Sequence, residues 1–334
     1  MHYKVSIIVP IYGVEQYIER CARSLFEQTY DNIEYVFVND STPDRSVEVL
    51  KKVIDEYPER KGNIKIINHE KNRGLSASRN TGLKNCKGDY VYFVDSDDYI
   101  HCKTIECLLQ ASIKENAGIV VGDFIDTNSS FEDTHCFFEN KEIQSVPIEM
   151  AIFEMLAFVV MKWCTAWNKL YKRSLIEGVF FDEEAYSIED QDFNIKVYQK
   201  LENLVYVPQC FYYYYQNPNS IIRNPSSTAK RFYLNTKYRF KMLEHILLGK
   251  NNDKYRAWIL DYGFRQTIER RDIVKGSEYE EPFKLMVNDL WKKNRKEYLI
   301  NNNIPIKKKF SFMFYWFLPR MSGCYLRIKK SEKC

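Results

Sequence analysis

The fold is decided by the stretch Asp89-Tyr90-Val91-Tyr92-Phe93-Val94-Asp95-Ser96-Asp97-Asp98. Its first part predicts a buried β-strand, and its end places three carboxylates within four residues. Carboxylates this close repel one another and raise each other's pKa unless a cation or hydrogen-bond donors lie between them. Residues i and i+2 of an extended segment point to the same side, so Asp95 and Asp97 are expected to face one site. A divalent cation with oxygen ligands suits such a pair; a solvated turn after a strand is the alternative.

Composition limits the classes of protein to which the chain can belong. Its 334 residues, 45% hydrophobic and 28% charged, are typical of a globular protein with one large domain or two unequal ones. The formal charge of +4 is too small to indicate a nucleic-acid partner. The nine cysteines are scattered, without a Cys-x-x-Cys pair, which favours reduced thiols in a cytoplasmic protein over disulfides or a zinc site. We expect neither a signal peptide nor a membrane-spanning helix.

Strands and helices alternate through the first 122 residues. The predicted strands are 5–9, 33–38, 64–67, 90–94 and 118–122, and the predicted helices are 14–28, 46–57, 76–86 and 104–115. Alternation at this period indicates βαβ units, which build an α/β fold with a mostly parallel sheet and helices on its faces. Open sheets of this kind bind ligands at the carboxyl ends of their strands. Asp40 and the acids from Asp95 to Asp98 stand at two such ends.

The remaining residues are patterned less regularly. Residues 124–147 predict no regular element, 147–161 a helix, 205–207 and 211–215 aromatic strands, and 229–247, 254–274 and 279–299 three helices. The change to helices after Pro218 and Pro225 predicts a boundary near residue 225. We therefore expect one domain over 1–225 and a helical C-terminal region over 226–334.

Four further stretches carry candidate site residues, each with a structural alternative. Tyr12 follows the first strand, Asp40 the second, Arg79 lies in the Gly- and Ser-containing segment 72–82, and Glu189 and Asp190 stand at the start of a helix. An arginine near a helix N-terminus suits a phosphate, and acids there also stabilise the helix dipole whatever else they do. Taken singly, each stretch is equally compatible with packing, capping or a solvated surface.

Taken in order, these stretches resemble those of the family 2 glycosyltransferases, which have a GT-A fold. The matching pieces are Val5–Tyr12, Val38–Asp40, Asn72–Gly82, Asp95–Asp98, Trp167–Tyr171 and Glu189–Phe193. They cover roughly residues 3–225 in the order of the family. The resemblance implies an α/β GT-A domain with a nucleotide-sugar site at the strand ends.

The resemblance also implies a role for each matched residue on the donor side. Tyr12 and Asp40 would hold the base, Asp95 the ribose, Asp97 a Mn²⁺ or Mg²⁺ ion bridging the diphosphate, and Arg79 the base or the diphosphate. Asp98 is assigned to local structure.

On the acceptor side, the resemblance assigns the general base to Asp190, which would deprotonate the acceptor hydroxyl. Glu189 would position the acceptor, and Trp167, Asn168 and Lys169 would shape the sugar and acceptor pocket. Ser220 and Arg223 lie where many members have a loop that closes over the diphosphate.

Three positions depart from the family pattern. Many members have two acids and a glycine after the second strand, where this chain has Asn39-Asp40-Ser41 and then Pro43. Gly13 stands where asparagine is frequent, and Ser78 where alanine is frequent. No departure removes a charge that the mechanism needs, but the turn from Ser41 to Pro43 bears on how the base is contacted.

The resemblance therefore implies an inverting, metal-dependent glycosyltransferase of hexosyltransferase type. It would transfer a sugar from a UDP-sugar to a hydroxyl of a glycan or lipid-linked acceptor in cell-surface polysaccharide synthesis. A nucleotidyltransferase on a similar sheet and a non-catalytic nucleotide-binding protein are the alternatives. The first would usually need a Gly-rich basic loop after the first strand, and the second would be expected to have lost some of the acids.

The C-terminal tail combines aromatic and basic residues. Lys307, Lys308 and Lys309 precede an uncharged run from Phe310 to Pro319, about half the length needed to cross a bilayer. Aromatic residues flanked by lysines suit an anionic membrane surface. We therefore predict peripheral contact through 305–330 at the inner face of the cytoplasmic membrane; an aromatic helix docked on the main domain is the alternative.

Overall fold

The chain forms two compact units. The computed structural model describes residues 3–127, 142–156, 160–185, 188–217, 228–249, 260–261, 264, 267 and 271–310. The first unit comprises Met1–Ala185 and Glu189–Ser220, and the second comprises Tyr186–Ile188 and Ile221–Cys334. The boundary predicted near residue 225 falls in 218–227, outside the described residues.

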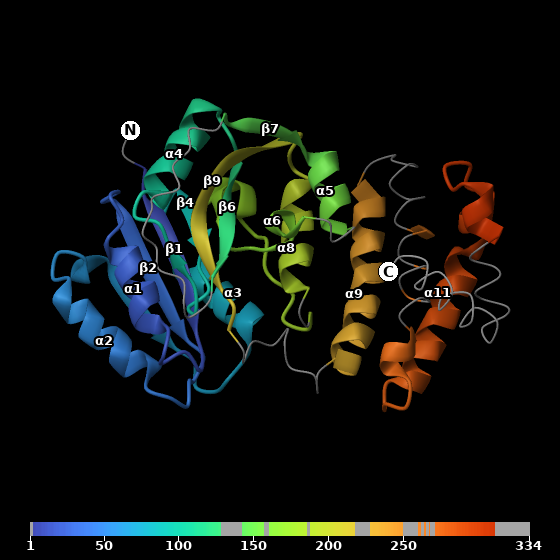
Figure 1. The fold of residues 1–334 in the computed structure, drawn as a ribbon, viewed down its shortest axis with the longest axis horizontal. Coiled ribbons are helices and arrows are strands. Elements are labelled where there is room, and N and C mark those ends of the chain that lie inside the picture. The colour runs from blue at the N-terminus through green and yellow to red at the C-terminus, as the bar shows by residue number, and fades with distance from the viewer. Residues whose placement is uncertain are drawn as a thin grey trace. The chain divides into compact units, whose positions relative to one another are not determined.

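The first unit is built on a nine-stranded mixed sheet. Its order is β3-β2-β1-β4-β8-β6-β9-β5, with β7 pairing β9. The strands are β1 (Val5–Ile11), β2 (Ile33–Asn39), β3 (Ile64–Asn68), β4 (Tyr90–Phe93), β5 (Tyr99–Ile100), β6 (Ile119–Thr127), β7 (Gln144–Pro147), β8 (Lys169–Lys172) and β9 (Asn203–Tyr215). The strands β3, β2, β1 and β4 are parallel, as predicted, while β8 runs antiparallel to β4 and β6. Figure 1 shows β9 curving across the sheet beside β6, its parallel neighbour.

Helices cover both faces of this sheet. They are α1 (Ile18–Phe26), α2 (Ser46–Glu56), α3 (Leu75–Asn85), α4 (Thr104–Lys114), α5 (Ile148–Leu156), α6 (Met161–Cys164), α7 (Arg173–Ile176) and α8 (Glu189–Tyr198), with a 3₁₀ turn η1 at Lys61–Asn63. Every residue of β1 is buried, because a strand with helices on both faces has no solvent side.

Alternate residues of the central strands pack on opposite faces. Ile7 and Val9 belong to the core cluster that contains the apolar sides of α1, α2 and α4. Ile8, between them, faces α3 so closely that a Cβ on Gly82 would lie 2.3 Å from its Cγ2. Phe93 of β4 packs edge-on against Phe193 of α8, with ring centroids 5.9 Å apart. The period-2 alternation of a strand thus gives the sheet two cores.

The sheet departs from the prediction on its β8–β6–β9 side. The absence of regular structure predicted for 124–147 is wrong where described: β6 continues to Thr127, and β7 occupies Gln144–Pro147. The two predicted aromatic strands are one strand, β9, with register shifts against β6 around Asp123. Strands β5 and β8, of two and four residues, were not predicted; pairing with distant strands defines them, and so short a pattern carries no period. Helix α1 begins at Ile18, four residues after the predicted start.

The second unit is helical where it is described. It contains α9 (Thr228–Gly249), the 3₁₀ helix η3 (Arg271–Val274) and α11 (Glu280–Ile300). A small core gathers Val274, Phe283 and Val287, with Phe232 and Tyr233 packed against it. Most of the helix predicted over 254–274, and the tail from 311 to 334, lie outside the described residues. Among the described helices, none is long and apolar enough to span a membrane.

Candidate active site

The acidic segment after β4 is a tight turn held from β9. The amide of Asp98 donates to the carbonyl of Asp95 (3.0 Å), which closes the turn. The hydroxyl of Tyr212 donates to Asp98 Oδ2 (2.6 Å), and the amide of Tyr215 donates to Asp98 Oδ1 (2.7 Å). Burial raises the pKa of Asp98 well above its usual range, and the neighbouring acids raise it further. Both oxygens of Asp98 are therefore engaged in holding the turn, in keeping with its predicted structural role.

Asp95 and Asp97 stay partly exposed, unlike Asp98. Burial raises the pKa of Asp95 to about 6, with repulsion from Asp190 and Asp97 adding to this and Arg79 opposing it. Burial also raises the pKa of Asp97, against a hydrogen bond from Asn217 Nδ2 to its Oδ2 (3.0 Å). Two carboxylates at the carboxyl end of the sheet therefore carry charge that the protein only partly compensates.

These two carboxylates fit a divalent cation that is shared with a diphosphate. No group of three or more His, Cys, Asp or Glu side chains forms a metal cage among the residues that the structure describes. Mg²⁺ is usually held by one or two carboxylates together with substrate phosphates, so a full protein cage is not required. A cation beside Asp97 would offset the cost of burying its charge, which is what raises the pKa of this carboxyl group.

Arg79 of α3 lies at the centre of an acidic cluster. Its side chain is 1% exposed. Nη2 donates to Asp95 Oδ1 (2.7 Å) and Nη1 to Asp190 Oδ1 (2.5 Å), while Glu189 Oε1 lies 3.6 Å from Nη1. We call Arg79 with Asp95, Glu189 and Asp190 the Arg79 cluster. It joins residues up to 111 positions apart in the chain, from the end of β4 and the start of α8.

Asp190 is fixed at both carboxylate oxygens. Arg79 holds Oδ1, and the amide of Ala166 donates to Oδ2 (2.8 Å). The side chain remains 18% exposed, so a hydroxyl can approach it. This combination of fixed orientation and partial access is what a general base requires.

Glu189 lies beside Asp190 and Arg79 at the start of α8. Burial raises the pKa of Glu189 to about 7, repulsion from Asp190 adds to the rise, and Arg79 opposes it. Its buried Oε2 has no hydrogen-bond partner among the described residues. Glu189 therefore holds a proton more readily than an ordinary glutamate does.

Asp40 forms a second acidic site, at the end of β2. Its Oδ1 accepts from the amide of Arg73 (2.8 Å) and lies 2.7 Å from His69 Nδ1, and its Oδ2 accepts from the amide of Gly74 (2.7 Å). His69 Nε2 in turn lies 2.8 Å from Thr81 Oγ1. We call Asp40, His69 and the amides of Arg73 and Gly74 the Asp40 corner. It ties the loop before α3 to the end of β2.

Tyr12 lies in the loop after β1, next to the Asp40 corner. The amide of Asp40 donates to the carbonyl of Ile11 (3.0 Å), and the Tyr12 side chain is 50% exposed. The neighbouring Gly13 has φ +67°, a conformation that glycine and asparagine tolerate best. Its amide donates to Thr42 Oγ1 (2.9 Å). The turn from Ser41 to Pro43 therefore supports the loop that carries Tyr12.

Trp167, Asn168 and Lys169 are all buried and directly follow Ala166, whose amide holds Asp190. Trp167 stacks on the ring of Tyr212, with centroids 4.4 Å apart. Asn168 accepts from the hydroxyl of Tyr92 (3.1 Å) and donates to the carbonyl of Asp123 (2.8 Å). Lys169 Nζ donates to the carbonyl of Thr165, and burial lowers its pKa to about 7. Their contacts are with protein groups, so they shape the site by supporting it.

Sequence reasoning missed several residues of this site. Tyr212, Tyr215 and Asn217 at the end of β9 hold the acidic turn, and the amide of Ala166 holds Asp190. The aromatic run in β9 predicted a strand, but the sequence did not show which of its residues would bind Asp98. Backbone donors leave no signal in a sequence. Ser220 and Arg223 lie outside the described residues.

Comparison with known proteins identifies the family. The sequence model described as glycosyl transferase family 2 matches residues 6–180, more than half of the chain. The chain belongs to this family. The resemblance noted in the sequence and the α/β GT-A fold are thus confirmed.

Individual relatives agree with this assignment. This glycosyltransferase is 36% identical over 242 residues to EpsJ of Bacillus subtilis, a match that covers 71% of this chain and 68% of EpsJ. It is 38% identical over 225 residues to the glycosyltransferase GlyA of Streptococcus pneumoniae, covering 66% of this chain but 32% of GlyA. The chain thus spans about a third of the length of GlyA.

A solved structure supports the fold. The S. aureus protein TarS, residues 1–349, crystallised with UDP-GlcNAc, superposes with a TM-score of 0.65 at 22% identity. The match covers 85% of this glycosyltransferase and 79% of that chain. At this level of identity the likeness concerns the fold.

Proposed function

We propose that this glycosyltransferase moves a sugar, with inversion, from a UDP-sugar to a hydroxyl of a glycan or lipid-linked acceptor in cell-surface polysaccharide synthesis. The observation that carries the proposal is the Arg79 cluster. One buried guanidinium binds both Asp95, predicted to hold the donor ribose, and Asp190, predicted to be the base. The donor side and the acceptor side of the reaction are thereby held in a fixed geometry.

In this mechanism Asp190 accepts the proton of the acceptor hydroxyl as that oxygen attacks the anomeric carbon. The attack comes from the face opposite the leaving diphosphate, which inverts the configuration. The transition state is oxocarbenium-like, as in glycoside hydrolysis. A Mn²⁺ or Mg²⁺ ion bound at Asp97 would neutralise charge on the leaving diphosphate. Arg79 keeps the Asp190 carboxylate oriented while the proton is transferred.

The uridine base is proposed to bind at the ends of β1 and β2. Tyr12 is half-exposed there and offers a ring on which the base can stack, while the Asp40 corner forms the neighbouring wall. The TarS complex with UDP-GlcNAc, of similar fold, supports UDP-sugars as the first donors to test.

A screen of nucleotide sugars tests this proposal directly. The full chain is incubated with UDP-, GDP- and TDP-sugars in Mn²⁺ or Mg²⁺, and release of the nucleoside diphosphate is measured with and without acceptor glycans. We expect turnover with a UDP-sugar and none after chelation or in Asp97→Ala, and proton NMR of the product should show the inverted anomer. Metal-independent transfer would refute the role of Asp97, and a retained anomer the role of Asp190.

Two further assays separate the alternatives. A nucleotidyltransferase would release pyrophosphate from UTP and a sugar 1-phosphate, and a non-catalytic protein would bind UDP without turnover. Membership of a glycosyltransferase family argues against both.

We further propose that the C-terminal region contacts anionic membrane. After α11, Ile306 and Phe310 are 68% and 61% exposed and flank Lys307, Lys308 and Lys309. Pelleting with anionic and neutral vesicles compares the full chain with a chain ending at Asn303. Binding of the full chain alone, and to anionic vesicles alone, supports the proposal; equal binding of both chains contradicts it.

A further inference from the structure

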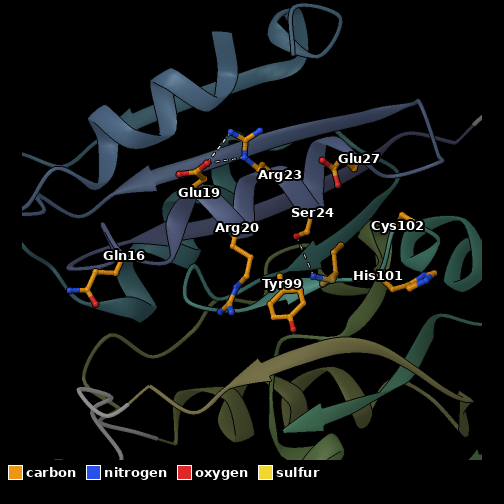
Figure 2. A pocket seen from close by; sticks show the side chains of 10 residues that line it. Gln16, Glu19, Arg20, Arg23, Ser24, Glu27, Tyr99, His101 and Cys102 are labelled. Atoms are coloured by element: carbon orange, nitrogen blue, oxygen red, sulfur yellow. Dashed lines mark hydrogen bonds and ion pairs between the residues drawn. The ribbon is translucent and has the colours of Figure 1, made fainter. Parts of the chain in front are cut away.

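Arg20 lies on α1, outside the Arg79 cluster, yet it contacts the acidic turn. Its guanidinium is packed against two tyrosine rings, with Cζ 4.3 Å from the ring centroid of Tyr99 and 4.8 Å from that of Tyr215. Figure 2 shows Arg20 extending from α1 toward Tyr99, at the side of a cavity of about 640 Å³. Nη2 donates to the backbone carbonyl of Asp97 (3.0 Å).

The contacts of Arg20 converge on the same turn as those of β9. Tyr215, whose ring faces the guanidinium, donates its amide to Asp98 Oδ1 (2.7 Å). Asn217, two residues further, donates to Asp97 Oδ2 (3.0 Å). The backbone of Asp97 is therefore held from α1, while its carboxylate and that of Asp98 are held from β9.

We propose that Arg20 is a positioning residue for the donor and its divalent cation. It fixes the backbone of Asp97 so that the Asp97 carboxylate stays directed at the metal and diphosphate. The inference rests on the proposed function of Asp97.

The chemistry of a guanidinium explains why arginine suits this position. Its flat face can pack against two aromatic rings while its edge donates hydrogen bonds, which an ammonium group cannot do equally well.

Arg23, one turn further along α1, offers a matched control. It lines the same cavity, and its guanidinium pairs with Glu56 (2.8 Å) and Glu19 (2.9 Å), both well exposed. Exposed ion pairs contribute little to stability. Replacing Arg23 removes a positive charge from the same helix without loosening Asp97.

The experiment measures metal and nucleotide binding without turnover. Electron paramagnetic resonance gives the Mn²⁺ affinity of the UDP complex, and calorimetry gives the UDP affinity in Mn²⁺ and in EDTA. For Arg20→Ala we expect about a 10-fold loss of Mn²⁺ affinity. The UDP affinity of Arg20→Ala in EDTA should change less than about 2-fold. For Arg23→Ala, the Mn²⁺ affinity and both UDP affinities should also change less than about 2-fold. Arg20→Lys, which preserves the charge, should fold like the wild type and regain only part of the Mn²⁺ affinity that Arg20→Ala loses.

Two outcomes distinguish failure of the inference from failure of the proposed function. If wild type binds Mn²⁺ with UDP and both Arg20 variants bind it equally well, Arg20 has no positioning role, and the proposed function stands. If wild type itself shows no metal-dependent UDP binding, the proposed role of Asp97 and the inference fall together. In an Asp97→Ala background, Arg20→Ala should cause no further loss of UDP affinity in Mn²⁺; a full additional loss would show that Arg20 acts elsewhere.

Discussion

The Asp40 corner and the Arg79 cluster both gather mostly buried acids near the carboxyl ends of strands, but they compensate the charge in opposite ways. At the Asp40 corner, a single carboxylate accepts hydrogen bonds from two backbone amides and lies against His69. In the Arg79 cluster, Asp95, Glu189 and Asp190 share one guanidinium. At the Asp40 corner, the hydrogen-bond donors are about as many as one carboxylate can use. In the Arg79 cluster, three carboxyl groups carry more negative charge than one guanidinium can balance.

The difference indicates what each site is built to do. A carboxylate held by backbone amides fixes the path of the chain, so the Asp40 corner sets the shape of the proposed base pocket. In the Arg79 cluster, burial raises the pKa of Asp95 to about 6 and that of Glu189 to about 7, and repulsion from the neighbouring acids adds to both rises. That cluster is suited to proton transfer and to a nearby cation. The following predictions test this contrast.

The largest effect should come from the base. Asp190→Asn preserves the shape of the side chain but cannot accept the proton, and general-base catalysis typically contributes about 10²–10⁴-fold. We expect kcat to fall by that factor while UDP affinity, measured by calorimetry, stays nearly unchanged. A variant with wild-type kcat would show that another group is the base.

The second prediction concerns the cation of the cluster. Arg79→Met should destabilise the first unit by about 3–5 kcal/mol near pH 7, because it leaves three mostly buried acids without their counter-ion. Urea unfolding measures the loss. Arg60→Met is the control, since Arg60 donates to the carbonyls of Phe26 and Gln28 and pairs with one exposed acid, Asp31 (3.4 Å), not with a cluster of acids. Equal losses of unfolding free energy in the two variants would show that neutralising three acids adds nothing to the contribution of Arg79 to stability.

A smaller change is expected at the Asp40 corner. Asp40→Asn turns an amide group toward the donors Arg73 N or Gly74 N, which costs about 1–3 kcal/mol in unfolding free energy. We also expect a higher KM for the donor with kcat little altered, because the loop beside the base would loosen. Asp55→Asn, at an exposed pair with Lys61, should change neither quantity. A fall in kcat alone would place Asp40 in the chemistry instead.

The smallest effect should be a pH dependence of stability caused by Glu189. Its pKa is raised from 4.5 to about 7 in the folded protein, so the folded form binds a proton that the unfolded form releases between these values. Its contribution to stability is therefore present at low pH and is lost as pH rises from about 4.5 to 7.

Glu189→Gln removes that loss. Without metal or donor, its Tm should match wild type near pH 5 and exceed it by about 2–4 °C at pH 8, as about 1 kcal/mol would produce in a domain of this size. Differential scanning calorimetry measures both, with the exposed Glu48→Gln as control. Parallel curves for wild type and Glu189→Gln would contradict the shifted pKa.

The sequence predicted the first half of the sheet because the buried strands β1 and β2 are largely apolar runs between helical patterns. It did not predict β8 or the single long β9, whose limits depend on pairing with strands far away in the chain. The candidate residues could be selected through the family resemblance. Their grouping in space could not be predicted. The contacts of Arg79 with Asp95 and Asp190 are tertiary contacts, and Asp40 is held by backbone amides, which every residue except proline has.

The double tether on Asp190 has a consequence for regiochemistry. With Arg79 on one oxygen and the Ala166 amide on the other, the carboxylate cannot rotate to follow its substrate. Only a hydroxyl that arrives along the remaining lone-pair directions can lose its proton. An acceptor with several similar hydroxyls would then be glycosylated at the one that its own docking brings to that fixed position. The side chains that surround Asp190 would therefore decide which glycosidic bond forms. Variants that reshape these surroundings should change the linkage while the base stays the same.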